Sequence, residues 1–213
     1  SCHSSGKGGI RDRYLGEDRR SVLQCQTTPF RHMLGISFRQ ETSFLYATFM
    51  QNLPNLAIDS PEAIAADIAA VARVSAVPGI LQVICNKTAM GFAAVARVTD
   101  KTWSACAVHD AIDFGLKPGG QLPLKTTLCF ESREAREPIV IDCFDESIAY
   151  RGHHTGEIYK LQSYVSVPII FSDGRYFGNL CAIDPRPHDV SDVRTISLFE
   201  AYAMLIASPL EHE

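Results

Sequence analysis

The segment Ser163–Asp184 decides the fold, and it reads SYVSVPIIFSDGRYFGNLCAID. Two apolar runs of strand length, 163–171 and 175–183, flank the turn sequence Ser-Asp-Gly, which is typical of a β-hairpin. Gly174 suits a turn position with positive φ, and Gly178 leaves room for another backbone to approach the second run closely. We therefore predict an antiparallel strand pair in this part of the chain.

Outward from this hairpin, the chain alternates between helical and strand patterns. Ser60 and Pro61 are a helix N-cap and first helical residue, and the helix they begin has an inner apolar stripe that includes Ile64. Pro78-Gly79 breaks or kinks this helix, which resumes up to about Lys87. The remaining expected elements, in chain order, are strands 92–98 and 102–109, a loop over 115–123, a short helix 127–136, a strand 139–141, a long polar segment 142–162 and a last helix from about 189 or 191 to 207.

This order predicts an α+β fold and excludes a doubly wound parallel sheet, because hairpin-linked strands pair antiparallel. Helices at both ends are expected to cover one face of the sheet. The last helix has two apolar stripes. One passes through Ile196 and Phe199, and the other through Leu198, Tyr202 and Leu205. The second stripe fits either the domain's own core or a partner subunit.

Length and composition narrow the class of protein. The chain has 213 residues, 46% of them hydrophobic, with a formal net charge of −4. These values predict one globular domain with appendages and no concentrated basic surface for nucleic acid. No apolar run reaches the length of a membrane helix, and no secretory signal is apparent.

The cysteines indicate a reducing environment. Their number is odd, seven, and no two form the C-x-x-C spacing of zinc-ribbon or thioredoxin sites. Most lie in apolar runs, where cysteine behaves as a small buried hydrophobic residue. We expect a cytoplasmic protein without disulfides.

The expected organisation has four parts. Residues 1–34 are polar and Gly/Ser/Arg-rich, which predicts a flexible or non-native leader, since Gly6-Lys7-Gly8 lacks the context of a phosphate loop. An N-terminal helix is expected within 35–57, the main domain over 58–208 and a tail over 209–213.

The hairpin sequence, together with Thr127-Leu128-Cys129 and Arg136–Asp142 upstream, resembles the GAF domain family, above all the GAF modules of bacterial sensor histidine kinases. The resemblance covers residues 58 to 208. It implies an antiparallel sheet of five or six strands, with terminal helices on one face and a pocket covered by loops and a short helix on the other. Such modules are regulatory inputs of signal-transduction proteins, including two-component systems.

Three GAF subclasses have chemistry that the sequence can test. A covalently bound bilin needs a cysteine followed by histidine before the SVPI strand, and Cys143 is followed by Phe144. The N-K, F, D-E signature of the cyclic-nucleotide subclass is absent at the required spacing. The free methionine sulfoxide reductases need two thiols, which Cys129 and Cys143 could supply, but their glycine-rich cysteine segment is missing.

The resemblance and the loop pattern together suggest which side chains line the pocket. Apolar and thiol side chains at 114, 128, 129, 144, 159 and 181 are expected to line it, with two histidines as polar groups. These candidate ligand-binding residues are His109, Phe114, Leu128, Cys129, Phe144, His154, Tyr159 and Cys181. Simpler roles stay open, because His153-His154 also fits an exposed turn and Cys129 a packed core position. No motif in the sequence predicts a metal site.

The resemblance implies a sensory module that binds an unidentified small molecule and carries no output domain of its own within these residues. A kinase or cyclase effector is expected in the full-length protein, and a homodimer is expected through the terminal helices. The ligand or cofactor is left open, and the alternatives are a methionine sulfoxide reductase-type enzyme or a degenerate domain that acts only in dimerisation.

Overall fold

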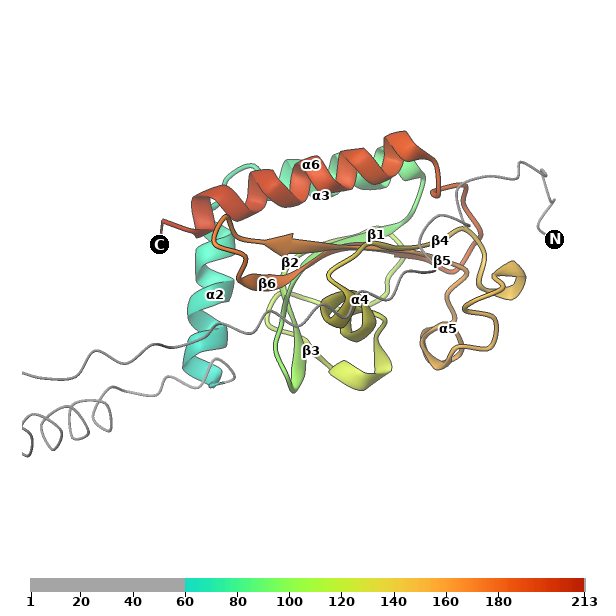
Figure 1. Cartoon of the computed structure of the whole chain (residues 1–213), viewed down its shortest axis with the longest axis horizontal. Helices are drawn as coiled ribbons and strands as arrows, with labels where there is room; N and C mark the ends of the chain where they lie inside the picture. The colour runs from blue at the N-terminus through green and yellow to red at the C-terminus, as the bar shows by residue number, and fades with distance from the viewer. Residues whose placement is uncertain (1–59, 213) are drawn as a thin grey trace, which may run out of the picture. The chain divides into compact units, whose positions relative to one another are not determined.

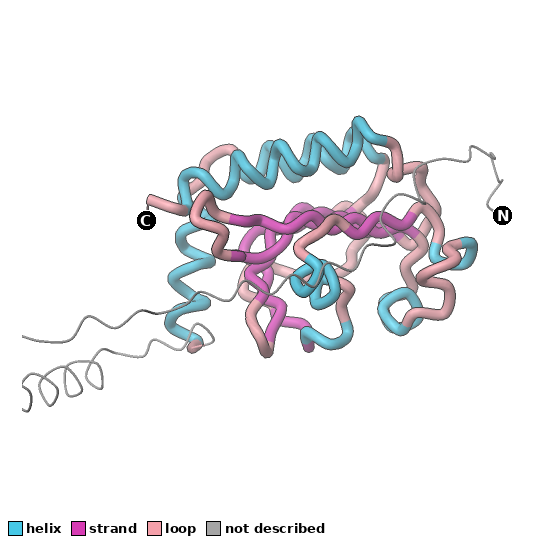
Figure 2. The backbone as a smooth tube through the Cα atoms, viewed as in Figure 1, coloured by secondary structure: helices cyan, strands magenta, loops and turns pink. Residues whose placement is uncertain are grey.

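The computed structural model describes residues 60–212, which form an antiparallel sheet with helices on one face and loops with short helices on the other (Figures 1 and 2). The sheet order is β3-β2-β1-β6-β5-β4. Its strands are β1 (Phe92–Val98), β2 (Thr102–Asp110), β3 (Gln121–Pro123), β4 (Ile139–Ile141), β5 (Ser163–Ile170) and β6 (Tyr176–Asp184). The α+β class and the six-stranded antiparallel sheet are therefore confirmed.

The predicted hairpin supplies two inner strands of the sheet, β5 and β6. β5 pairs with β6 from Ser163↔Asp184 to Ile170↔Tyr176, and β6 pairs with β1 on its other side. Gly174 lies in the turn at φ 84°. Gly178 sits opposite Arg97 on β1, where a Cβ would come within 1.8 Å of the Ala96 carbonyl oxygen. Only glycine allows β1 and β6 to pair this closely.

Three helices cover one face of the sheet: α2 (Pro61–Arg73), α3 (Val77–Thr88) and α6 (Val193–Leu210). Ser60 caps α2 as predicted, since its Oγ accepts from the Ala63 N–H at 3.1 Å. Phe199 and Ile206 of α6 are fully buried against the sheet, so the first predicted stripe is confirmed.

The opposite face carries the shorter elements, α4 (Cys129–Ala135), α5 (His154–Tyr159) and two 3₁₀ turns, Leu124–Thr126 and Phe144–Glu146. The long polar segment therefore contains two short helical pieces. Its side chains join those of the sheet in a second apolar core that includes Phe92, Trp103 and Leu128. Because strand side chains alternate between faces, one sheet supplies both cores.

Several boundaries differ from the sequence expectations. The segment 115–123, expected to be loop throughout, ends in β3, because three residues pair with β2 despite their glycine-rich lead-in. The helix break lies at 74–76, ahead of Pro78, which occupies the first turn of α3. α6 continues to Leu210, and this residue is buried, so the expected tail begins too early.

The expected leader and the expected N-terminal helix lie outside the described residues. Within 60–212, no single helix is long and apolar enough to cross a membrane. The pair α2 and α3 meets the length and composition test only when the two helices are taken together, and they are bent by 77° at the break between them.

Candidate functional site

A small, partly open cavity lies between the sheet and its short-helix cover. Its volume is about 30 Å³. The lining side chains are almost all apolar, aromatic or thiol, and come from β1, β2, β5 and β6 below and from the cover above. They are Phe92, Trp103, Phe114, Leu116, Leu122, Thr127, Cys129, Thr155, Tyr159, Leu161, Tyr164, Cys181 and Ile183.

One part of the cover is the loop after β2, and the Asp110 carboxylate holds it. Its oxygens accept the backbone N–H groups of Ile112 (3.2 Å), Phe114 (3.1 Å) and Gly115 (2.8 Å). Partial burial raises the pKa of Asp110, but these N–H donors outweigh it and lower the pKa overall. The loop thereby places the Phe114 ring 5.0 Å from that of Phe92.

The other part of the cover is α5, fastened to the chain before α4 by polar contacts. The Tyr159 hydroxyl lies 2.6 Å from the Thr126 hydroxyl. Thr155 Oγ1 donates to the Thr126 carbonyl at 2.9 Å, and His154 Nε2 donates to the Lys125 carbonyl at 2.7 Å. Tyr159 and Phe114 meet at a ring separation of 6.0 Å, so the two parts of the cover close over the cavity together.

The polar end of the cavity is a thiol, Cys129, at the start of α4. The indole N–H of Trp103 donates to its sulfur at 3.2 Å, the Tyr164 hydroxyl lies 3.1 Å away and the Ser166 hydroxyl 3.5 Å away. Burial opposes ionisation of this thiol, but hydrogen bonds from Cys181 and these three groups prevail and lower its pKa to about 7.

Ionisation is correspondingly disfavoured at the neighbours of Cys129. The hydrogen bond to Cys129, followed by burial, raises the pKa of Cys181 well above its ordinary value, and burial with the negative charge of Cys129 does the same for Tyr164. The group that ionises most readily in this cluster is therefore Cys129.

The structure brings together four of the eight predicted residues. Phe114, Cys129, Tyr159 and Cys181 all line the cavity. Leu128 and Phe144 are buried in the same core but are not part of the lining. The Phe144 ring packs against Gly156 of α5, so closely that a Cβ at position 156 would lie 2.9 Å from the ring.

The two histidines are placed differently from the expectation. His109 pairs across the sheet with Ala93, whose side chain belongs to the helix-side core, so His109 points away from the cavity. The bulge between Val95 and Ala96 shifts the alternation of β2, which the sequence alone does not reveal. His154 is exposed on the outside of the cover.

The structure also corrects the expected thiol pair. Cys143 donates to the Gln162 side chain at 3.3 Å and is not part of the lining, whereas Cys181 is the thiol beside Cys129. Trp103, Tyr164 and Ser166 were not among the sequence candidates. Trp103 and Tyr164 lie in apolar segments that the sequence predicts as strands, but only the packing of α4 on β5 reveals that both contact the Cys129 sulfur.

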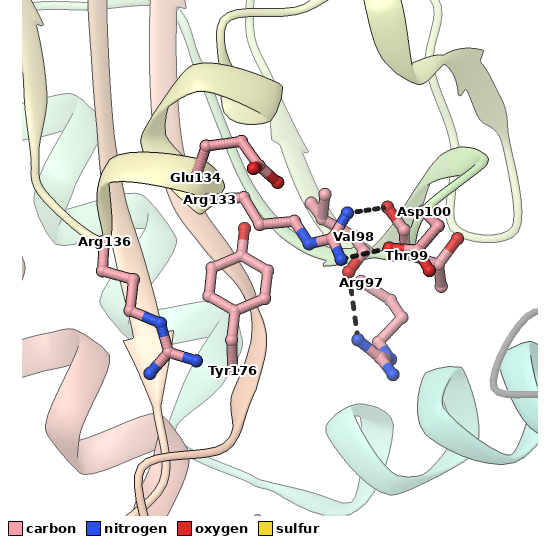
Figure 3. Close-up of a pocket in the computed structure, with 8 residues that line it drawn as sticks. All are labelled: Arg97, Val98, Thr99, Asp100, Arg133, Glu134, Arg136 and Tyr176. Carbon is pink, nitrogen blue, oxygen red and sulfur yellow. Dashed lines mark hydrogen bonds and ion pairs between the residues drawn. The ribbon is translucent and has the colours of Figure 1, made fainter. Parts of the chain in front are cut away.

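A second hollow, of about 340 Å³, lies at the end of the β1–β2 hairpin and includes Arg97, Arg133 and Arg136 (Figure 3). Its arginines already have partners. Arg97 donates to Asp67 at 2.6 Å, Arg133 bonds Asp100 and the Thr99 carbonyl, and Arg136 donates to the Gly174 carbonyl at 2.7 Å. These bonds link β1 to α2, and α4 and the residue after it to the β1–β2 and β5–β6 turns, so we assign this hollow a structural role.

No group of three or more His, Cys, Asp or Glu side chains within 60–212 is arranged to hold a metal ion. The candidate site is therefore the apolar cavity with its thiol end.

The sequence and the fold were compared with those of known proteins. A sequence profile of the GAF domain matches residues 64–210, whereas the comparison with curated proteins found no significant match. Among solved structures, the GAF domain of Thermosynechococcus elongatus PixJ in its blue-light-absorbing form is 16% identical, with a TM-score of 0.51 over 63% of this chain and 82% of its own.

Two further GAF structures align over most of their own length. The GAF domain of Acinetobacter phosphoenolpyruvate-protein phosphotransferase is 11% identical, with a TM-score of 0.50 over 68% of this chain and 92% of its own. A GAF domain region from a Geobacter sulfurreducens PCA protein is 12% identical, with a TM-score of 0.52 over 71% of this chain and 98% of its own. At these identities the structures establish the fold alone, and together with the profile match they show that the chain belongs to the GAF domain family.

Proposed function

We propose that this domain is a sensory input module that binds a small, largely apolar molecule non-covalently beneath its short-helix cover. The observation that carries the proposal is the cavity itself, which is apolar along its walls and has a few polar groups at one end, as ligand sites commonly do. A molecule larger than a few atoms requires Phe114 and Tyr159 to move apart.

The cover can move because few polar contacts fasten it. The Thr126–Tyr159 hydroxyl contact and the His154–Lys125 bond are both near the surface, where water replaces a lost partner at little cost. A bound molecule would therefore shift the balance between closed and open covers.

The same strands offer a route from the cavity to the helices. Cys181 of β6 lines the cavity, while Leu180 and Ala182, its neighbours in β6, pack in the core beneath the helices. α4 contacts β5 and β6 from the cavity side, and α6 contacts them from the other. A change in the cover would reach α6 through these two strands.

The signalling context is part of the same proposal. We propose an effector domain such as a kinase or cyclase in the full-length protein, and a homodimer formed through terminal helices. A cytoplasmic location fits the buried free thiols of Cys85, Cys106, Cys129 and Cys181.

Trp103 makes the proposal testable, because it is the single tryptophan of the chain and lines the cavity. The purified protein is denatured and searched by mass spectrometry for a co-purified molecule, and Trp103 fluorescence is titrated with small uncharged heterocycles. Tyr159→Ala should weaken binding at least about fivefold, whereas Ile158→Ala, an exposed neighbour on the same helix, should not.

A domain that only mediates dimerisation is the second candidate, and the small volume of the cavity favours it. In that case no molecule co-purifies, no heterocycle changes the fluorescence, and the oligomeric state is the same for Tyr159→Ala and the wild type.

A further inference from the structure

Two thiols from distant parts of the chain meet at the polar end of the cavity. Cys129 begins α4, and Cys181 lies in the middle of β6. Ser166 of β5 pairs with Cys181 across the sheet, and its hydroxyl lies 3.5 Å from the Cys129 sulfur. Both thiols line the same cavity, where the Cys181 thiol also donates to the Ala94 carbonyl at 3.6 Å.

The groups around the Cys129 sulfur favour its anion. An indole N–H can only donate, so Trp103 requires the sulfur to accept its hydrogen bond. The Tyr164 and Ser166 hydroxyls can donate to the same atom. A neutral thiol is a weak acceptor, whereas a thiolate gains from every donor.

Other buried cysteines of the same protein lack this arrangement. Burial raises the pKa of Cys85 to about 11 and that of Cys106 to about 12, and both lie in the core beneath the helices. Burial alone therefore does not make a reactive thiol here, and the convergence of donors distinguishes Cys129.

The cavity gives a small reagent access to both sulfurs. Cys129 and Cys181 are both in its lining, and its volume of about 30 Å³ suits a molecule of two or three heavy atoms. Hydrogen peroxide is of this size.

We propose that Cys129 and Cys181 form a peroxide-oxidised thiol pair, in which Cys129 is the attacking sulfur and Cys181 the resolving one. This inference is independent of the proposed small-molecule ligand, because the cavity has room for the reagent without any movement of the cover.

The chemistry takes two steps. The Cys129 thiolate attacks one peroxide oxygen, an S–O bond forms, the O–O bond breaks and hydroxide leaves, so that sulfur is oxidised to a sulfenic acid and peroxide is reduced. The Cys181 thiol then attacks the Cys129 sulfur, the S–S bond forms, and the sulfenic oxygen leaves with protons as water. The sum is two thiols and one peroxide giving one disulfide and two waters.

The disulfide would alter the cover as well as the sulfurs. It ties the first turn of α4 to the middle of β6 and replaces the acceptor of the Trp103 indole N–H with a much poorer one. Tryptophan fluorescence therefore reports the reaction directly.

The test treats the full chain with hydrogen peroxide under native conditions and maps modified cysteines by mass spectrometry, while Trp103 fluorescence is recorded. We expect a loss of two hydrogens in a Cys129–Cys181 cross-linked peptide, formed at least about tenfold faster than any oxidation of Cys85 or Cys106. In Cys181→Ser treated with peroxide while folded, a sulfenic acid at Cys129 should be trapped by dimedone that is present as the protein is then unfolded.

Matched variants separate this reaction from general oxidation. Cys129→Ser should abolish both the cross-link and the fluorescence change, and Cys106→Ser should abolish neither. Tyr164→Phe, which keeps the ring and removes one donor, should slow the reaction at pH 7 about threefold to tenfold.

Oxidation that begins at Cys85, Cys106 or Cys143, or a wild-type rate equal to that of Cys106, would overturn the proposal. So would Cys181→Ser protein that is treated with peroxide while folded, then unfolded in dimedone, and carries no adduct at Cys129. Because no heterocycle is needed, failure here leaves the ligand titration of Trp103 unaffected, and failure of that titration leaves this proposal unaffected.

Discussion

At the scale of single residues, chemistry in this domain depends on which groups surround a side chain more than on how deeply it is buried. Cys106 and Cys129 are each 2% exposed. Burial raises the pKa of Cys106 to about 12, whereas at Cys129 burial is outweighed by four hydrogen-bond donors that lower it to about 7. The two thiols differ because one backbone donor, from Arg97, faces Cys106, whereas four side-chain donors face Cys129.

The lowered pKa of Cys129 predicts a pH profile. Its thiolate fraction should rise with pH and reach half near pH 7, so the rate of reaction with peroxide should increase between about pH 6 and 8 and then level off. The titratable groups facing this sulfur are Cys181 and Tyr164, and burial raises the pKa of both, so neither ionises in this range. Stopped-flow Trp103 fluorescence measures the profile, and a rate that keeps rising up to pH 9 contradicts it.

The Asp110 carboxylate holds the loop that carries Phe114, so its removal should loosen the cover. Asp110→Ala loses three acceptor contacts and should lower the free energy of unfolding by about 1–3 kcal/mol. Asp110→Asn keeps the oxygen that serves Ile112 and Phe114 and should cost less. Urea unfolding followed by Trp103 fluorescence compares them, and equal losses for the two variants would contradict this role of the loop.

At the scale of elements, the central strand pairing depends on the absence of one side chain. Gly178 faces Arg97 on β1, and a Cβ at 178 would overlap the Ala96 carbonyl oxygen. The β5–β6 hairpin is local in sequence, whereas the β1–β6 pairing is not. The β1–β6 pairing therefore depends on the close backbone approach that Gly178 allows.

Two glycine substitutions should consequently have opposite effects. Gly178→Ala should destabilise the domain by at least about 2–4 kcal/mol, because backbone must move to relieve the overlap. Gly79→Ala in α3 meets no atom within 4 Å and should stabilise by about 0.5–1 kcal/mol. Thermal unfolding of both variants checks this, and a tolerated Gly178→Ala would show that the strands are farther apart than described.

At the scale of the whole described domain, the two faces of one sheet contribute to two separate hydrophobic cores. The helix-side core is closed by α2, α3 and α6, while the opposite core contains the cavity and the thiol pair. α6 adds an outer face with Met204 67% exposed and Leu205 60% exposed, although Tyr202 of the same predicted stripe packs against the core. The second stripe therefore divides between the domain's own core and its surface.

This division predicts different results for two charged substitutions on α6. Leu205→Glu should leave a folded domain with a Tm within about 2 °C of wild type, and should convert a dimer that uses this face into a monomer. Phe199→Glu should unfold the domain, because a carboxylate would replace a fully buried ring. Light scattering and circular dichroism distinguish the two, and an unfolded Leu205→Glu would assign the whole stripe to the core.

The sequence by itself determined most of the local structure. Ser60 capping α2, the turn at Gly174 and the apolar runs of β5 and β6 are properties of neighbouring residues, and each was predicted from residue type and spacing. The antiparallel pairing of the strands followed from the hairpins, and the GAF resemblance followed chiefly from the hairpin at 163–184. The side chains at 114, 129, 159 and 181 were correctly expected to lie together.

Only the tertiary structure decided which atoms meet. Because of the bulge at Val95/Ala96, His109 lies on the helix face of the sheet. Because α4 packs on β5 and β6, the thiol next to Cys129 is Cys181 and not Cys143. Periodicity specifies the face on which a side chain lies, but a contact between residues 52 positions apart depends on how two elements dock. The chemistry at Cys129 arises from that docking, because its hydrogen-bond partners come from three different strands.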